Sequence, residues 1–270
     1  MPPATPLPAA TVILLRDAAQ SPEVLMIERH SRSEFMPDVY VFPGGRVDDA
    51  DLALGERTAG ITHAAARAAL PTIPPELALG FFVAAVRETF EEAGVLLARV
   101  PGSSELLPPE QVAALGKHRL DVQSGRLSFS ELILGEGLEL ATNTFDVHAH
   151  WITPENNPKR FDTIFFSTLA PVGQLAAHDG FESTGHIWIR PEDALDQGRS
   201  GKRQMVFPTS CNLETLCGFG TARDALDASR RRPVVAVMPR IEIEDGKRIL
   251  VIPEEAGYGV RREVVRGGIA

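Results

Sequence analysis

Apolar residues along the chain fall into two patterns, short runs of β type and one longer stripe at helical spacing. The β-type runs are "ATVILLRD" (10–17), "EVLMIERH" (23–30), "VYVF" (39–42), "RFDTIFFSTLA" (160–170) and "GHIWIR" (185–190). Each has the length and residue types of a strand. We expect the third run to stop at the sharp turn Pro43-Gly44-Gly45.

Residues 76–93 carry apolar side chains at intervals of three and four, which predicts a helix that ends at Gly94. Weaker helical patterns occupy 108–118, 129–134, 191–198, 212–219 and 222–232. Asp245-Gly246 stands between two alternating runs and predicts a β-hairpin. Strands and helices interleave, so we expect a mixed sheet with helices on both faces.

Composition narrows the possible functions. The formal net charge of −9 argues against a protein that coats nucleic acid. Cys211 and Cys217 are too far apart for a CxxC motif and are read as free thiols of a reducing compartment. We find neither a signal peptide nor an apolar run of membrane-spanning length, so we expect a cytoplasmic protein that binds neither nucleic acid nor membrane.

The segment "RETFEEAGV" (87–95) places three carboxylates, Glu88, Glu91 and Glu92, on one face at the end of the predicted helix. Acids in the last turn oppose the helix dipole by about 0.3–1 kcal/mol each. One arginine, Arg87, does not neutralise three acids. An exposed acidic helix end is one reading, and a bound divalent cation is the other. Ligands that are all oxygen favour Mg²⁺ or Mn²⁺ over zinc.

The same segment resembles the second half of the Nudix box, G-x5-E-x7-R-E-U-x-E-E-x-G-U, where U is a bulky aliphatic residue. Arg87, Glu88, Glu91, Glu92 and Gly94 match its fixed letters at the right spacing. Thr89 stands where an aliphatic residue is usual. Counted from Gly45, the first acid position falls on Asp51, and 35 residues separate it from Arg87 where the pattern has seven.

The resemblance implies an α/β/α sandwich and hydrolysis of a diphosphate linked to another group. Glu88, Glu91 and Glu92 are then the ligands of Mg²⁺ or Mn²⁺, together with the carbonyl of Gly45. Arg87 orients the glutamates. Many members place a further acid in a loop before a later strand, and Glu182 is the candidate here. It is as readily an ordinary loop residue.

The long interruption of the box resembles the coenzyme A diphosphatase branch related to the mammalian peroxisomal enzyme. "EFMPDVYVFPGG" and "HWITPENNPKRFDTIFF" agree with that branch. The predicted reaction releases 3′,5′-ADP and (acyl-)4′-phosphopantetheine. Arg29, Arg46 and Arg160 are candidate phosphate contacts. We expect an apolar groove for the pantetheine or acyl arm, formed by the insertion or by residues 101–147.

We therefore predict a single domain over 1–270 of class α/β. It has a helical insertion at about 52–80, a further helical segment at about 101–147 and a C-terminal β-hairpin extension at about 232–270. ADP-ribose, a dinucleotide or a nucleotide sugar are alternative substrates. A nucleotide-sensing module without catalysis is the alternative of another class. The partner is a small molecule, and a homodimer is left open.

Overall fold

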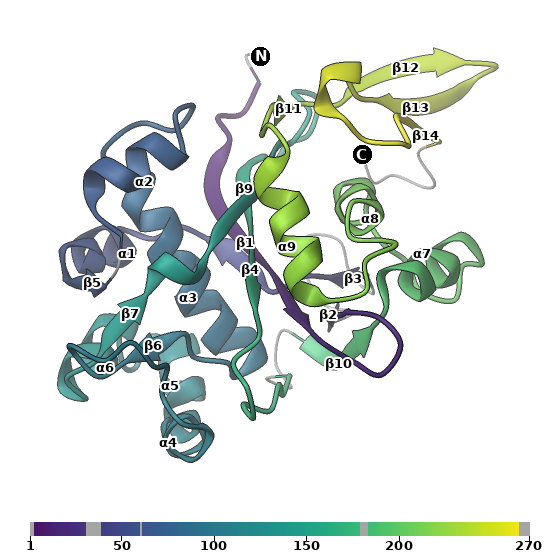
Figure 1. Ribbon diagram of the computed structural model, residues 1–270. Coiled ribbons are helices and arrows are strands. Elements are labelled where there is room, and N and C mark those ends of the chain that lie inside the picture. Colours follow the sequence, from purple (N-terminus) through teal and green to yellow (C-terminus); the bar gives the residue numbers. More distant parts are fainter. Residues whose placement is uncertain (1–2, 31–38, 60, 179–182, 265–270) are drawn as a thin grey trace.

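Strand β1 (Leu7–Arg16) runs through the centre of the molecule and is buried on both faces. The structure is a computed structural model that describes residues 3–30, 39–59, 61–178 and 183–264 (Figure 1). Its main sheet has the order β10-β2-β1-β9-β8-β11, with β3 paired to β2 and β4 paired to β1. These further strands are β2 (Glu23–Arg29), β3 (Tyr40–Val41), β4 (Gly44–Arg46), β8 (Asp146–Ile152), β9 (Phe161–Leu169), β10 (Ser183–Ile189) and β11 (Ala236–Val237).

The sheet is mixed, as the sequence predicts. β1 pairs parallel with β9, and β8 pairs parallel with β11. The pairs of β1 with β2, β1 with β4, β2 with β10 and β8 with β9 are antiparallel. Residues of β1 alternate between two separate cores, with Val12 and Leu14 in one and Ile13 and Leu15 in the other. A sheet whose two faces are both apolar needs a helical layer on each side.

Helix α3 (Ala78–Ala93) covers one face, and α7, α8 and α9 cover the other (Figure 1). The helix predicted over 76–93 begins two residues later in the structure, at Ala78, and ends as predicted before Gly94. Gly94 adopts φ 69°. A left-handed residue at this position favours glycine. The other helices are α1 (Asp49–Leu54), α2 (His63–Ala69), α4 (Pro109–Leu115), α5 (Arg119–Gln123), α6 (Phe129–Gly135), α7 (Pro191–Arg199), α8 (Phe207–Glu214) and α9 (Ala222–Arg231).

The insertion and the segment that follows α3 lie together on the outer side of α3. Helices α1 and α2 contact α3 directly. A small sheet of order β5-β7-β6 joins β5 (Thr58–Ala59) of the insertion to β6 (Ala98–Arg99) and β7 (Glu139–Ala141). Helix α3 is therefore buried nearly all round, instead of exposing its polar side to water.

The C-terminal extension contains the predicted hairpin. β12 (Arg240–Glu244) and β13 (Lys247–Val251) are joined by Asp245 and Gly246, which adopt φ 49° and 75°. Two positive φ angles are those of a type I′ turn, which Asp-Gly favours. β14 (Arg262–Val264) completes a three-stranded sheet. Short 3-10 turns occur at Gly55–Arg57, Gly116–His118, Thr142–Thr144 and Glu254–Ala256.

Two expectations for local structure are wrong. Strand β3 ends at Val41, before Pro43 as expected, but Gly44 and Gly45 belong to strand β4 against β1 and not to a turn. The propensity of two glycines favours a turn. In the structure Gly44 lies so close to β1 that a Cβ would meet the carbonyl oxygen of Ala10. The helix expected at 212–219 is α8, which begins earlier, at Phe207 with Pro208 in its first turn, and ends at Glu214. Proline suits that first turn.

No helix among the described residues combines the length and the apolarity needed to cross a membrane.

Replacing Phe166 by alanine tests the core beneath α3. Its ring lies in β9 and packs against Phe82 at 4.6 Å and Phe145 at 5.5 Å between ring centroids. Phe166→Ala should lower the free energy of unfolding by about 3–5 kcal/mol, because the side chain is fully buried and leaves a cavity. Val172→Ala, at a side chain that is 95% exposed, is the control in denaturant titrations. Equal midpoints for the two variants would contradict this packing.

Candidate active site

Arg87 lies at the centre of a buried cluster of charges. Its Nε donates to Oδ1 of Asp51 at 2.9 Å, and its Nη2 donates to Oδ2 of the same carboxylate at 2.9 Å. Asp51 is 2% exposed and Arg87 is 8% exposed. A bidentate pair of this kind fixes both position and orientation of the guanidinium. Asp51, the acid that counting from Gly45 selects, is thus paired with Arg87, although the insertion separates it from α3 in sequence.

The remaining donors of Arg87 hold three other groups. Nη1 donates to Glu88 at 2.7 Å and to Glu91 at 3.2 Å, and Nη2 donates to the carbonyl of Arg46 at 2.7 Å. Burial lowers the pKa of Arg87, but the hydrogen bonds to Asp51 and the charges of Glu88, Asp51 and Glu91 outweigh that effect and raise it. The guanidinium therefore stays charged and links β4, α1 and α3.

The two glycines of the Pro-Gly-Gly segment lie directly against the glutamates. The amide of Gly44 donates to Oε2 of Glu92 at 2.7 Å. A Cβ on Gly45 would lie 2.4 Å from Oε1 of Glu88, and a Cβ on Gly44 would lie 2.5 Å from the carbonyl oxygen of Ala10. Only glycine fits at Gly44, where the clash is with backbone, whereas a Cβ at Gly45 requires the carboxylate of Glu88 to move. The sequence "GG" is thus explained by close packing between β1 and α3.

The carboxylates outnumber the cations in this cluster. Burial raises the pKa of Glu88 to about 7, with the charges of Glu91 and Asp51 adding to the rise and that of Arg87 opposing it. No group of three His, Cys, Asp or Glu side chains within the described ranges is arranged to hold a metal ion. Glu88 and Glu91 instead share one nitrogen of Arg87. Their chemistry still fits Mg²⁺ or Mn²⁺, since the donors are all oxygen and carry excess negative charge.

The end of α3 receives a cation that the sequence did not reveal. Nη2 of Arg119, in α5, donates to the backbone carbonyl of Glu91 and to that of Ala177, both at 2.9 Å. A cation at a helix C-terminus offsets the unfavourable acids there. Nothing in the sequence pairs a residue of 101–147 with this helix end, so only the fold could identify Arg119.

A cavity of about 290 Å³ opens beside this cluster. Asp48, Asp51, Arg87 and Glu91 line one side, and residues of the 122–130 segment line the other. The helical segment after α3 therefore forms an outer wall around Glu91.

The other predicted site residues are scattered. Arg46 is exposed on β4, next to the glycines. Arg29 lines a second and larger cavity, and its buried Nε has no hydrogen-bond partner among the described residues. Arg160 is buried and donates to the carbonyls of Thr153 and Ala4 at 3.0 and 2.7 Å, contacts typical of a structural arginine. Glu182 lies outside the described residues.

The layered fold and the Arg87 cluster beneath the two glycines are features of a Nudix domain. The sequence matches a model of the NUDT19 Nudix domain over residues 4–216. The chain belongs to the NUDT19 Nudix domain family.

Curated relatives agree with this assignment. The chain is 29% identical over 239 residues to the acyl-coenzyme A diphosphatase NUDT19 of Gallus gallus, an alignment that covers 75% of this chain and 63% of the relative. It is 28% identical over 242 residues to the human protein of the same name, with coverage of 76% and 63%. The chain thus spans a little under two thirds of the length of these relatives.

A solved structure is similar as well. A Nudix hydrolase from Alicyclobacillus acidocaldarius is 27% identical and superposes with a TM-score of 0.63, over 83% of this chain and 96% of that one. The predicted α/β fold class is confirmed.

Asp51→Asn tests the role of the ion pair. The variant keeps the shape of the side chain but removes the charge that faces Arg87. We expect a loss of about 1.5–3 kcal/mol in unfolding free energy, the range for hydrogen bonds to charged groups. Asp49→Asn, at an exposed position of the same helix, is the control. If chemical denaturation gives both variants the same stability, Asp51 does not anchor Arg87.

Gly45→Ala tests the close packing at the glutamates. Its Cβ cannot occupy the present position without displacing the carboxylate of Glu88. We expect hydrolytic turnover to fall at least tenfold, because Glu88 is moved, while the protein still folds. Gly218→Ala, where a Cβ would meet no atom within 4 Å but φ is positive, controls for the general cost of the substitution. Wild-type kinetics in Gly45→Ala would contradict the packing argument.

Proposed function

We propose that this protein hydrolyses the diphosphate linkage of coenzyme A or acyl-coenzyme A in a reaction that depends on a divalent metal ion. The products are 3′,5′-ADP and (acyl-)4′-phosphopantetheine. The observation that carries the proposal is the cluster of Glu88, Glu91 and Glu92 around Arg87 beneath the glycine pair. The names of the curated relatives suggest the substrate.

The residues of the cluster divide into candidate metal ligands and groups that position those ligands. Glu88 and Glu91 would hold the Mg²⁺ or Mn²⁺ ion, and we keep Glu92 and the Gly45 carbonyl as further candidate ligands. When bound, such an ion neutralises charge on the diphosphate and lowers the pKa of a coordinated water. Arg87 orients Glu88 and Glu91. Glu92 accepts a hydrogen bond from the Gly44 amide and so keeps β4 in register over the helix.

A preorganised cluster suits this chemistry. In diphosphate hydrolysis the protein acts mainly by positioning groups and by stabilising charge. Arg87 is held by Asp51 and by the Arg46 carbonyl, so its orientation does not depend on the substrate. Glu182 remains a candidate for an additional catalytic acid.

The phosphate contacts are proposed at two arginines. Arg46 follows the glycines and is exposed, and its backbone carbonyl accepts a hydrogen bond from Arg87 of the cluster. Arg29 has a buried Nε that finds no acceptor within the part of the chain that the structure describes. Arg160 was a third candidate, but its hydrogen bonds to Thr153 and Ala4 make it the weakest of the three. A cytoplasmic location and a homodimer also remain predictions.

The decisive assay follows hydrolysis by chromatography. Purified protein with Mg²⁺ or Mn²⁺ is incubated with coenzyme A, acetyl-coenzyme A, ADP-ribose, NADH and a diadenosine polyphosphate. We expect 3′,5′-ADP and the phosphopantetheine fragment, and turnover at least 100-fold lower in Glu91→Gln, since loss of one charged ligand weakens stabilisation of the transition state. A chelator should abolish turnover, and added Mg²⁺ or Mn²⁺ should restore it.

Glu110→Gln, at an exposed position of α4, is the matched control and should keep wild-type turnover. Cleavage of ADP-ribose, a dinucleotide or a nucleotide sugar instead would retain the role of α3 and reject the substrate. Binding without cleavage of any substrate would favour the nucleotide-sensing alternative.

A further inference from the structure

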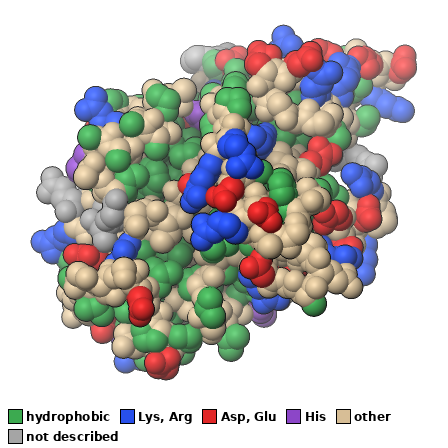
Figure 2. Space-filling model, viewed as in Figure 1, with side chains coloured by type: hydrophobic (Ala, Val, Ile, Leu, Met, Phe, Trp, Pro, Cys, Tyr) green, Lys and Arg blue, Asp and Glu red, His purple; other side chains and the backbone are tan. Residues whose placement is uncertain are grey.

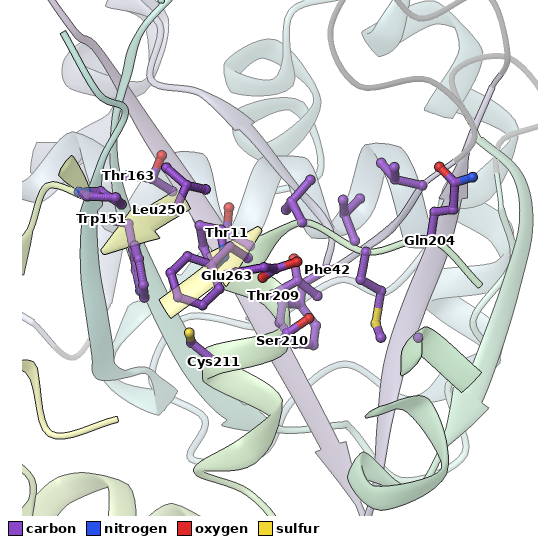
Figure 3. A pocket seen from close by; sticks show the side chains of 18 of the residues that line it. Thr11, Phe42, Trp151, Thr163, Gln204, Thr209, Ser210, Cys211, Leu250 and Glu263 are labelled. Atoms are coloured by element: carbon purple, nitrogen blue, oxygen red, sulfur yellow. The ribbon is translucent and has the colours of Figure 1, made fainter. Parts of the chain in front are cut away.

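A cavity of about 620 Å³ lies on the sheet face opposite α3 (Figure 3). The sheet forms its floor, α8 forms one wall, and the C-terminal strands β13 and β14 form another. Its size is typical of a site for a small molecule. Neither the insertion nor the 101–147 segment contributes to its lining, so the groove expected there from the sequence is not this cavity.

The floor of the cavity leads from the glycine pair across four strands. Gly44 of β4 pairs with Thr11 of β1, Thr11 pairs with Phe165 of β9, and the nearby Thr163 pairs with Trp151 of β8. All of these residues line the cavity. Three strand spacings make the floor roughly 14 Å long. One end is therefore Gly44, whose amide binds Glu92 on the opposite side of the sheet.

The walls are mainly apolar and suit an uncharged, extended group. Phe42, Phe207, Met205 and Leu250 supply aromatic and aliphatic surface. Hydroxyl groups of Thr209 and Ser210 point into the same space (Figure 3). A pantetheine arm carries amides and a hydroxyl along a flexible aliphatic chain, so these walls can pack its chain and hydrogen-bond its amides.

Charged side chains of both signs also line the cavity. Two acids, Glu214 and Glu263, line it together with two arginines, Arg29 and Arg199. Glu263 projects into the cavity beside Thr209 and Ser210 (Figure 3). The carboxylate of Glu263 disfavours a phosphate at the C-terminal wall and can accept a hydrogen bond from an amide N–H of the pantetheine end, whereas Arg29 is the candidate phosphate contact of the same cavity.

The C-terminal strands are fixed over the cavity. Nε1 of Trp151 donates to the hydroxyl of Tyr258 at 3.1 Å, and that hydroxyl donates to Oδ1 of Asn212 at 2.9 Å. The guanidinium of Arg232 lies 5.0 Å above the Tyr258 ring. The wall formed by Leu250, Val260 and Val264 lies outside the stretch that matches the family model.

We propose that this cavity holds the (acyl-)pantetheine arm while the diphosphate lies at the Arg87 cluster, and that the C-terminal strands determine which acyl chains are accepted. The inference rests on the proposed function for the identity of the substrate. The acyl end of the substrate then points to the C-terminal wall, where Val260 and Val264 determine the acyl-chain specificity.

Narrowing the cavity at its C-terminal wall tests the inference. Val260→Trp places a large ring at a position that is 42% exposed, so the protein should still fold. We expect the ratio of kcat/KM for decanoyl-coenzyme A to that for coenzyme A to fall at least tenfold. Val264→Trp, at the same wall, should lower the ratio in the same direction. Ile243→Trp, on the exposed face of β12 and outside the cavity, should leave it unchanged.

A binding measurement separates this inference from the proposed reaction. Titration calorimetry without metal compares decanoyl-4′-phosphopantetheine with 3′,5′-ADP. We expect Val260→Trp to weaken binding of the acylated arm at least tenfold and to leave binding of 3′,5′-ADP unchanged.

Three results would overturn the inference: an unchanged selectivity ratio in both tryptophan variants, weaker binding of 3′,5′-ADP alone, or no binding of the acylated arm to the wild-type protein. If no coenzyme A compound is hydrolysed but the acylated arm binds as expected, the proposed reaction fails and the cavity assignment stands.

Discussion

The ion pair between Arg87 and Asp51 is the interaction on which the candidate site depends. It joins α3 to the first helix of the insertion, and the same guanidinium reaches the Arg46 carbonyl of β4. Both partners are buried, so removal of either leaves a charge without its counterpart. Because Arg87 also holds Glu88 and Glu91, the geometry of the carboxylates follows from this pair. Helix α1, which carries Asp51, lies beside α3 (Figure 1), so this pair ties the start of the insertion to the site.

Three acids at the end of a helix are costly, and the structure shows how the cost is reduced. Arg87 binds two of them, the Gly44 amide binds the third, and Arg119 reaches the carbonyl of Glu91 at the helix end. The compensation is incomplete, since burial and neighbouring acids still raise the pKa of Glu88. A cluster that keeps excess negative charge in a buried place is suited to a divalent cation, which is the basis of the metal dependence proposed above.

The sequence predicted those parts of the molecule that depend on local pattern. Helix α3 follows from its apolar spacing and from Gly94, and the C-terminal hairpin follows from Asp245-Gly246. The partners of α3 come from distant segments, which no periodicity connects: Arg119 lies 28 positions beyond Glu91. Arg160 illustrates a different limit, because the sequence could not show that its guanidinium donates to the backbone carbonyls of Thr153 and Ala4. An arginine with no obvious partner in the sequence can donate to backbone carbonyls or bind a ligand, and only the fold distinguishes these two roles.

The two faces of the sheet carry different tasks in this arrangement. Figure 2 shows Lys, Arg, Asp and Glu side chains in the middle of the visible face, where Figure 1 has α9, and along the upper right, where it has the C-terminal strands. The Arg87 cluster lies on the α3 side and the large cavity on the α8 side, and both abut β4. Gly44 belongs to both, since its amide binds Glu92 while its backbone lines the cavity. Leu250 and Val264 of the C-terminal strands line the large cavity and do not line the smaller cavity beside Arg87. A change in the C-terminal strands can therefore alter the proposed acyl selectivity without moving Glu88, Glu91 or Glu92. The cavity and the carboxylates share the backbone of Gly44, which pairing with β1 holds in register.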